Sequence, residues 1–147
     1  MMKKFLMMLV CGLMAIGSVS AQQKADDIVG TYRTKHNGVN SRVEVKKVGD
    51  GYRAQVIWVD NLKKEDGSIR MDDKNPDKAK RNTPANQIVL IEKVTYDSEK
   101  GEWRNGQIYD PTRGKSFKVR LSFKDATTLK VRGSWGPISE TMYWTKL

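Results

Sequence analysis

Apolar and polar residues alternate in short runs from residue 28 to the end of the chain. In the clearest run, every odd position from Phe117 to Phe123 is apolar and the positions between are charged or polar. A period of two residues is that of a β-strand with one buried and one solvated face. After residue 27 no stretch keeps the 3.6-residue period of a helix, apart from a turn or two at 76–82. The pattern therefore predicts an all-β protein.

The alternating runs predict eight strands separated by turn residues. The turn sequence Asn37-Gly38 is a strong hairpin signal, because its residues tolerate the positive φ angles of tight turns. Brief turns join every neighbouring pair except the third and fourth strands, which are separated by residues 60–86. The predicted strands are 28–34, 41–47, 52–59, 87–96, 102–110, 115–123, 128–134 and 141–146.

Eight consecutive antiparallel strands would leave two unpaired edges in an open sheet, and closure removes both. We therefore expect a single eight-stranded antiparallel up-and-down barrel of the lipocalin-like (calycin) type. A β-sandwich is the alternative, because the order of strands along the chain does not reveal closure. The long connection, residues 60–86, is typical of a lid or a binding loop.

The first residues have the order of a secretory signal peptide. Two lysines precede an apolar run at 5–16, and small residues end at Ala21, where we predict cleavage. The apolar run is shorter than the roughly 20 residues of a spanning helix. Cys11, the single cysteine, would leave with the signal peptide. We thus expect an exported protein, periplasmic or secreted, with a signal peptide at 1–21, a flexible lead-in at 22–26 and a barrel domain at 27–147.

The chain is basic, with 27 lysines and arginines against 17 aspartates and glutamates. Removal of Lys3 and Lys4 with the signal peptide leaves 25 − 17 = +8. The cations alternate with apolar residues and form no basic block, which is typical of solvated strand faces. We expect weak attraction to anionic envelope lipids, no nucleic-acid partner and no transmembrane segment after the signal is removed.

Several ordered motifs resemble a family of small exported bacterial proteins, domain of unknown function 2147, which is lipocalin-like. Thr83 stands where that family has a second arginine in its loop motif. The resemblance implies the barrel fold over nearly all of the mature chain, and it implies no particular chemistry. The matching segments are 25–32 (ADDIVGTY), 72–77 (DDKNPD) with Arg81 and Pro84, 103–111 (WRNGQIYDP) with Gly114-Lys115, 129–133 (LKVRG), and Thr141 with Trp144-Thr145.

The resemblance also implies how one end of the barrel closes. In lipocalin-like barrels a late cationic side chain stacks on an early aromatic ring. The matching residues in this chain are Arg132 and Tyr32, which would give the pair a structural role through a cation–π contact.

Residues able to perform catalysis are scarce in the mature chain. It contains no cysteine, and His36 lies in a predicted turn with no second histidine to share a metal. The spacing of Asp73, Asn75 and Asp77 is similar to the start of a calcium loop, but the glycine and the closing glutamate of such a loop are missing. We expect no cofactor, no metal site and no enzymatic activity.

The function that fits this pattern is binding of a small apolar or amphipathic molecule inside the barrel. The candidate lining residues are Trp58, Tyr109, Phe117, Val119 and Leu121, and the candidate lid residues are Asp72, Asn75, Asp77 and Arg81. A structural or protein-interaction module with a filled core is the second hypothesis. An enzyme that uses carboxylate, tyrosine and arginine chemistry is the third.

Overall fold

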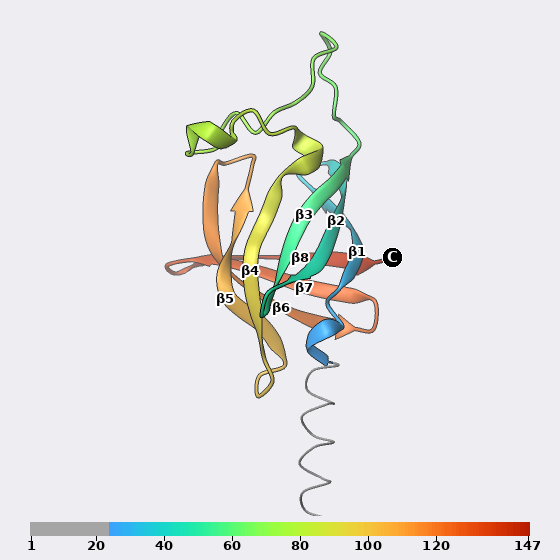
Figure 1. Cartoon of the computed structure of the whole chain (residues 1–147), viewed down its shortest axis with the longest axis vertical. Helices are drawn as coiled ribbons and strands as arrows, with labels where there is room; N and C mark the ends of the chain where they lie inside the picture. Colours follow the sequence, from blue (N-terminus) through green and yellow to red (C-terminus); the bar gives the residue numbers. More distant parts are fainter. Residues whose placement is uncertain (1–23) are drawn as a thin grey trace, which may run out of the picture.

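Each predicted run forms one strand of a closed barrel in the computed structural model, which describes residues 24–147 (Figure 1). Every strand pairs antiparallel with the next, and the last pairs with the first, so the predicted up-and-down barrel is confirmed. The predicted signal peptide, residues 1–21, lies outside the described residues. The strands are β1 (Gly30–His36), β2 (Val39–Val48), β3 (Gly51–Val59), β4 (Val89–Asp97), β5 (Glu102–Asp110), β6 (Lys115–Asp125), β7 (Thr128–Trp135) and β8 (Ile138–Lys146).

The antiparallel order defines two ends of the barrel. The closed end holds residues 24–29, the β2–β3, β4–β5 and β6–β7 turns, and the C-terminus. The open end holds the β1–β2, β5–β6 and β7–β8 turns and the segment 60–88 between β3 and β4. The β1–β2 turn has positive φ at Asn37 (50°) and Gly38 (79°), as its sequence predicts.

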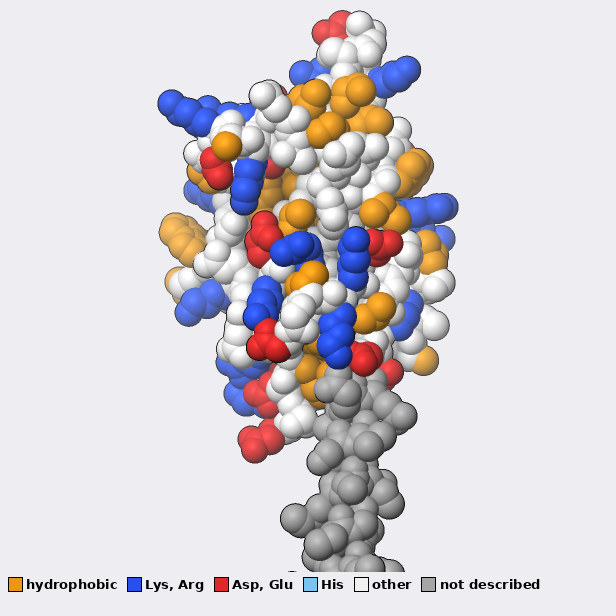
Figure 2. Space-filling view, in the orientation of Figure 1, with side chains coloured by type: hydrophobic (Ala, Val, Ile, Leu, Met, Phe, Trp, Pro, Cys, Tyr) orange, Lys and Arg blue, Asp and Glu red, His pale blue; other side chains and the backbone are white. Residues whose placement is uncertain are grey.

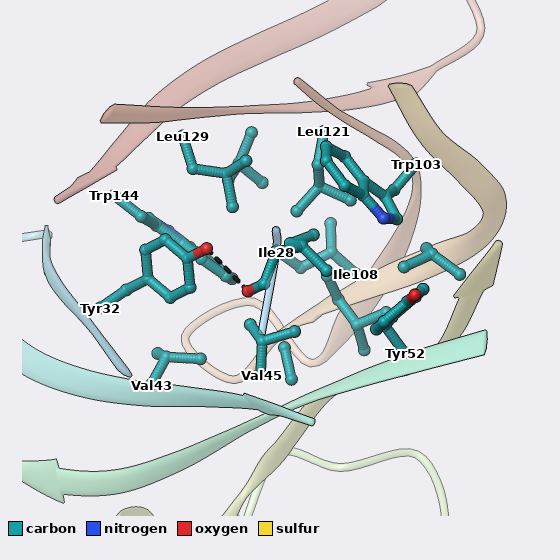
Figure 3. Close-up of a cluster of buried hydrophobic side chains, with 14 of the residues drawn as sticks. Ile28, Tyr32, Val43, Val45, Tyr52, Trp103, Ile108, Leu121, Leu129 and Trp144 are labelled. Carbon is teal, nitrogen blue, oxygen red and sulfur yellow. Dashed lines mark hydrogen bonds between the residues drawn. The ribbon is translucent and has the colours of Figure 1, made fainter. Parts of the chain in front are cut away.

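The closed end is filled by aromatic side chains and by the segment that precedes β1. The Tyr32 hydroxyl donates a hydrogen bond of 2.7 Å to the Ile28 carbonyl (Figure 3). The Trp103 indole donates one of 3.0 Å to the Ala25 carbonyl. Ala25 and Ile28 are buried, and residues 24–26 are helical. For residues 24–26 this differs from the expected flexible lead-in, because the segment plugs the barrel.

The core consists of inward-facing positions from every strand. Leu129 and Val131 of β7 are fully buried. The next residue toward the open end, Arg132, is exposed, as the alternation of a strand requires. The largest fully buried side chains are Trp144, Tyr32, Ile28, Ile91, Leu121, Leu129, Val43, Val94 and Val131. These residues lie mainly in the closed half of the barrel, which is therefore solid.

The segment 60–88, here named the lid, lies across the open end (Figure 1). It contains two short 3-10 helices, η1 (Lys78–Lys80) and η2 (Ala85–Gln87). Isolated bridges join Lys63 to Ile69 and Met71 to Pro84, so the lid folds back on itself. Over residues 24–147 we find no helix with the length and apolar character needed to cross a bilayer.

Candidate functional site

A cavity of about 410 Å³ occupies the open half of the barrel, between the solid core and the lid. Residues from all eight strands line it. Trp144 contributes to its inner end, where its ring lies 6.1 Å from that of Tyr32. The wall is apolar and includes Val56, Ile88, Leu90, Ile108, Phe117, Val131 and Met142. The barrel is thus filled at one end and hollow at the other.

Gly133 of β7 helps to keep this space open. A Cβ atom at this position would point inward and lie 3.5 Å from the Phe117 Cβ and 3.6 Å from the Ile108 Cγ2. Those distances are ordinary van der Waals contacts, so the backbone accommodates a side chain here. Any group beyond the Cβ would occupy the cavity. The absence of a side chain at Gly133 therefore contributes volume to the site.

Charged side chains surround the mouth of the cavity, and several pair with one another. Arg113 lies 3.1 Å from Glu140 and 3.6 Å from Asp110, and His36 lies 3.8 Å from the same Asp110 carboxylate. Asp73, Lys74 and Lys64 also border the opening. The site therefore changes from apolar at its inner end to ionic at its mouth.

A partly buried hydrogen bond fastens the lid to the barrel wall. Asp72 of the lid is only 3% exposed, and its Oδ1 accepts a bond of 2.7 Å from the Tyr109 hydroxyl of β5. Its Oδ2 accepts a bond of 2.8 Å from the Asn75 amide. Burial, followed by the hydrogen bond to Asp72, raises the pKa of Tyr109 above its ordinary value, so the phenol stays protonated as a donor.

A second contact holds the lid against the β5–β6 turn. The Lys74 ammonium donates a bond of 3.0 Å to the Thr112 carbonyl. Gly114 has a φ of +65°, and a Cβ there would lie 2.3 Å from the Lys74 carbonyl oxygen. Only glycine permits so close an approach of lid and turn. The lid is therefore an ordered cover, seated on the turn beside the mouth.

The predicted lid residues hold the lid itself together. Arg81 donates a bond of 2.7 Å to the Asn75 carbonyl, and the Asn75 side chain accepts one of 2.9 Å from the Asp77 amide. Asp77 caps η1 through the Ala79 amide. These bonds give the motif a structural role within the lid. Within residues 24–147, no three His, Cys, Asp or Glu side chains are grouped so as to hold a metal ion.

The predicted lining residues divide into three groups. Tyr109 and Phe117 line the cavity. Val119 and Leu121 face inward but lie in the solid core beneath it. Trp58 is 45% exposed and lies outside the barrel, where the Arg42 guanidinium sits 5.5 Å from its ring, so its prediction as a lining residue is wrong.

The predicted stack of Arg132 on Tyr32 is also wrong. Arg132 pairs with Thr141 on the outer face of β7, and its guanidinium donates to the Ser139 hydroxyl. Tyr32 is buried inside the closed end. At that end the nearby cation is Lys146 of β8, which donates to the Asp27 carbonyl and lies 5.6 Å from the Phe123 ring.

Sequence reasoning missed several members of the site. His36, which the sequence predicts in a turn, instead ends β1 at the mouth, where it lies 3.8 Å from Asp110. Gly133 and Met142 line the cavity but are not among the predicted lining residues. Their inward position follows from the alternation of β7 and β8, because Val131 pairs with Met142 and both face the cavity. Counting alternate positions from the buried Leu129 would have identified Gly133.

Comparisons with known proteins agree with this geometry. A family model described as "Uncharacterized protein conserved in bacteria (DUF2147)" matches residues 30–146. A similar solved structure is protein HP1028 from the human pathogen Helicobacter pylori, described as belonging to the lipocalin family. The two chains are 25% identical, the match covers 82% of each, and the TM-score is 0.67. No curated protein matches the chain.

Proposed function

Because this chain belongs to the DUF2147 family of uncharacterised bacterial proteins and shares the barrel of a lipocalin-family protein, we propose that it binds one small amphipathic molecule in the open half of the barrel. The observation that carries this proposal is the cavity of about 410 Å³, apolar within and charged at its mouth. That volume lies in the range of small-molecule sites, roughly 300–1,000 Å³.

The graded polarity of the site indicates how the ligand lies. Its apolar part packs among Ile108, Phe117 and Met142, because removing apolar surface from water is the main driving force there. Its polar group stays at the mouth, near Arg113 and His36. A fully apolar ligand would match only the inner end of the site, whereas an amphipathic one matches both the apolar wall and the polar mouth, so the amphipathic class fits better.

We propose binding without chemical conversion of the ligand. Asp110 and Glu140 both lie within ion-pair distance of Arg113, and this cluster at the mouth suits the holding of a polar group. The lid, fastened through Tyr109 and Asp72, covers the entrance. Ligand exchange would then require this bond to break and re-form, so the lid sets the rate of exchange.

Filling the cavity from Gly133 tests the proposal. We expect Gly133→Leu to stay folded but to lose binding of a fluorescent fatty-acid analogue by at least about 30-fold, because the added side chain occupies the ligand's space. Gly133→Ala is the matched control, since its single methyl group makes only ordinary contacts. It should bind within about threefold of the unmodified protein.

The binding measurement is titration of fluorescence, with circular dichroism to check the fold. Equal binding by the Leu and Ala variants would place the probe outside the cavity. Absence of binding by the unmodified protein, for amphiphiles with anionic, cationic and neutral heads alike, would favour the filled-core interaction module instead.

We also propose that binding takes place outside the cytoplasm, in the periplasm or after secretion. The sequence pattern of residues 1–21 supports this. N-terminal sequencing of the protein from its host should begin at Gln22. An intact Met1, or a lipid on Cys11, would refute the cleavage prediction.

A further inference from the structure

The outer face of β6, β7 and β8 carries a set of cations that the ligand site does not use. Their side chains alternate with the buried Val119, Leu121, Leu129 and Val131, so they point away from the barrel. Apart from Asp125 at its edge, the other outer positions of these strands are Ser, Thr or Tyr. We name this surface the basic face; it consists of Lys118, Arg120, Lys124, Lys130 and Arg132.

The basic face has no counter-charges of its own. None of its five cations forms an ion pair with any residue between 24 and 147. Two acids at its edges are engaged elsewhere: Glu140 faces the cavity mouth and bonds Arg113, and Asp125 accepts from the Thr127 amide in its own turn.

The opposite side of the barrel is different. There Lys46 lies 3.4 Å from Glu44, Arg53 lies 3.6 Å from Glu92, and Lys93 pairs with Asp50. Figure 2 shows acidic and basic side chains intermixed over β3 and β4. In Figure 1, β6, β7 and β8 cross behind these strands. Ion pairs therefore offset several cations over β2, β3 and β4, whereas none within residues 24–147 offsets the cations of the basic face.

One pair within the basic face is unfavourable for folding. Arg120 and Arg132 are direct cross-strand partners on β6 and β7. Like charges in this arrangement destabilise a sheet. A negatively charged partner lying on the face would remove this repulsion, so the arrangement points to a binding surface.

Exposed aromatic and aliphatic side chains accompany the cations. Trp135, at the β7–β8 turn, is 66% exposed, and the Lys115 ammonium lies 5.8 Å from its ring. Tyr143 on β8 is exposed beside Lys124, whose ammonium lies 5.1 Å away. Ile138, in the same turn as Trp135, is exposed and also borders the cavity mouth. Amphipathic rings next to cations are typical of surfaces that meet the lipid–water interface.

We propose that the basic face binds the surface of an anionic phospholipid bilayer, with Trp135 and Ile138 entering the headgroup region. Lysines and arginines near such a surface are attracted to its negative potential, and apolar groups at the turn add burial. The exposed Trp135 and Ile138 favour a bilayer over a nucleic acid, which offers no apolar layer. Docking in this way brings the cavity mouth to the membrane, but the proposal does not depend on what the cavity binds.

Vesicle co-sedimentation of the purified protein tests the proposal. The test variant carries Lys118→Gln, Arg120→Gln, Lys130→Gln and Arg132→Gln. The matched control carries Lys46→Gln, Arg53→Gln, Lys80→Gln and Lys93→Gln, which removes the same net charge from residues in ion pairs elsewhere. The vesicles are phosphatidylcholine with or without phosphatidylglycerol.

We expect the unmodified protein to bind only the vesicles that contain phosphatidylglycerol, less tightly as salt is added. The test variant should bind at least about 30-fold more weakly and the control within about threefold. Arg120→Gln alone, which also relieves the repulsion, should stay folded and bind about fivefold more weakly. Equal losses in test and control variants, binding to pure phosphatidylcholine, or tighter binding to a DNA oligonucleotide than to the vesicles would overturn the proposal.

Discussion

The two ends of this barrel are built from the same alternating strands but differ in what fills them. At the closed end Tyr32, Trp103 and Trp144 are buried, and the Tyr32 hydroxyl and the Trp103 indole donate to carbonyls of the segment that precedes β1. At the open end, Gly133 and the lid leave a cavity of about 410 Å³ bordered by charges. We therefore expect stability to be concentrated at the closed end, which allows the open end to remain hollow.

The largest expected effect is at the closed end. Replacing Trp103 by Ala should lower the free energy of unfolding by about 4 kcal/mol. The substitution removes the bond to the Ala25 carbonyl and the contact with the Tyr96 ring, whose centre lies 4.7 Å from that of Trp103. Chemical denaturation followed by circular dichroism measures the loss. A loss below about 1 kcal/mol would show that the closed end is not the main source of stability.

A matched pair of Tyr→Phe substitutions sharpens the comparison, because each removes one hydroxyl from one end. Tyr32→Phe should lower the free energy of unfolding by about 1–2 kcal/mol, because the buried Ile28 carbonyl loses its hydrogen-bond donor. Burial, and then the charge of Asp27, raises the pKa of Tyr32 above its ordinary value. The unfolded chain therefore loses this proton near pH 10, where the folded protein retains it.

The pH dependence follows from this difference. The stability of the unmodified protein should be complete below about pH 10 and should fall as the pH rises further, because unfolding then releases a proton. Tyr32→Phe should show a shallower decline, and unfolding curves between neutral pH and pH 11 or so test this. Parallel declines in the two proteins would assign the alkaline loss to other groups.

The smallest effect is expected at the open end. Tyr109→Phe removes the bond to Asp72, which keeps its bond from Asn75. We expect global stability to fall by less than about 1 kcal/mol, while amide exchange in residues 72–83 becomes about fivefold faster. Hydrogen exchange measured by mass spectrometry distinguishes local opening of the lid from a loss of global stability. A global loss as large as that of Tyr32→Phe would mean that the lid belongs to the folding core.

The strands and the closure could be predicted because both depend on local alternation and on the cost of open edges. The outward position of Trp58 could not be predicted, because a register shift interrupts the alternation of β3. Arg42 pairs with Trp58, but the next residue, Val43, pairs with Val56, so one extra residue enters β3. This bulge turns Trp58 outward and Val59 toward the cavity. Bulges have no clear signature in a single sequence.

The hydrogen bonds between the lid and the barrel could not be predicted from the local sequence pattern either. Asp72 and Tyr109 are 37 residues apart, and only the closed barrel brings them within 2.7 Å. The sequence indicates the motif 72–77 as part of a lid, but its partner on β5 follows from tertiary structure alone. The prediction of Arg132 as the cation at the closed end failed for a similar reason. Arg132 and Lys146 lie on the neighbouring strands β7 and β8, but only Lys146 lies at the closed end, and Arg132 points away from the barrel.

The seam between β1 and β8 determines when the barrel can be completed. These strands pair at only two positions, Tyr32 with Lys146 and Arg33 with Thr145. Closure of the barrel therefore depends on the last residues of β8. Hairpins between consecutive strands form within microseconds, but this contact must wait for the whole chain. Folding therefore cannot finish until Lys146 has left the ribosome or a translocation pore. Until then β1 and β8 remain unpaired edges, and a chaperone that holds such edges would protect the chain during this interval.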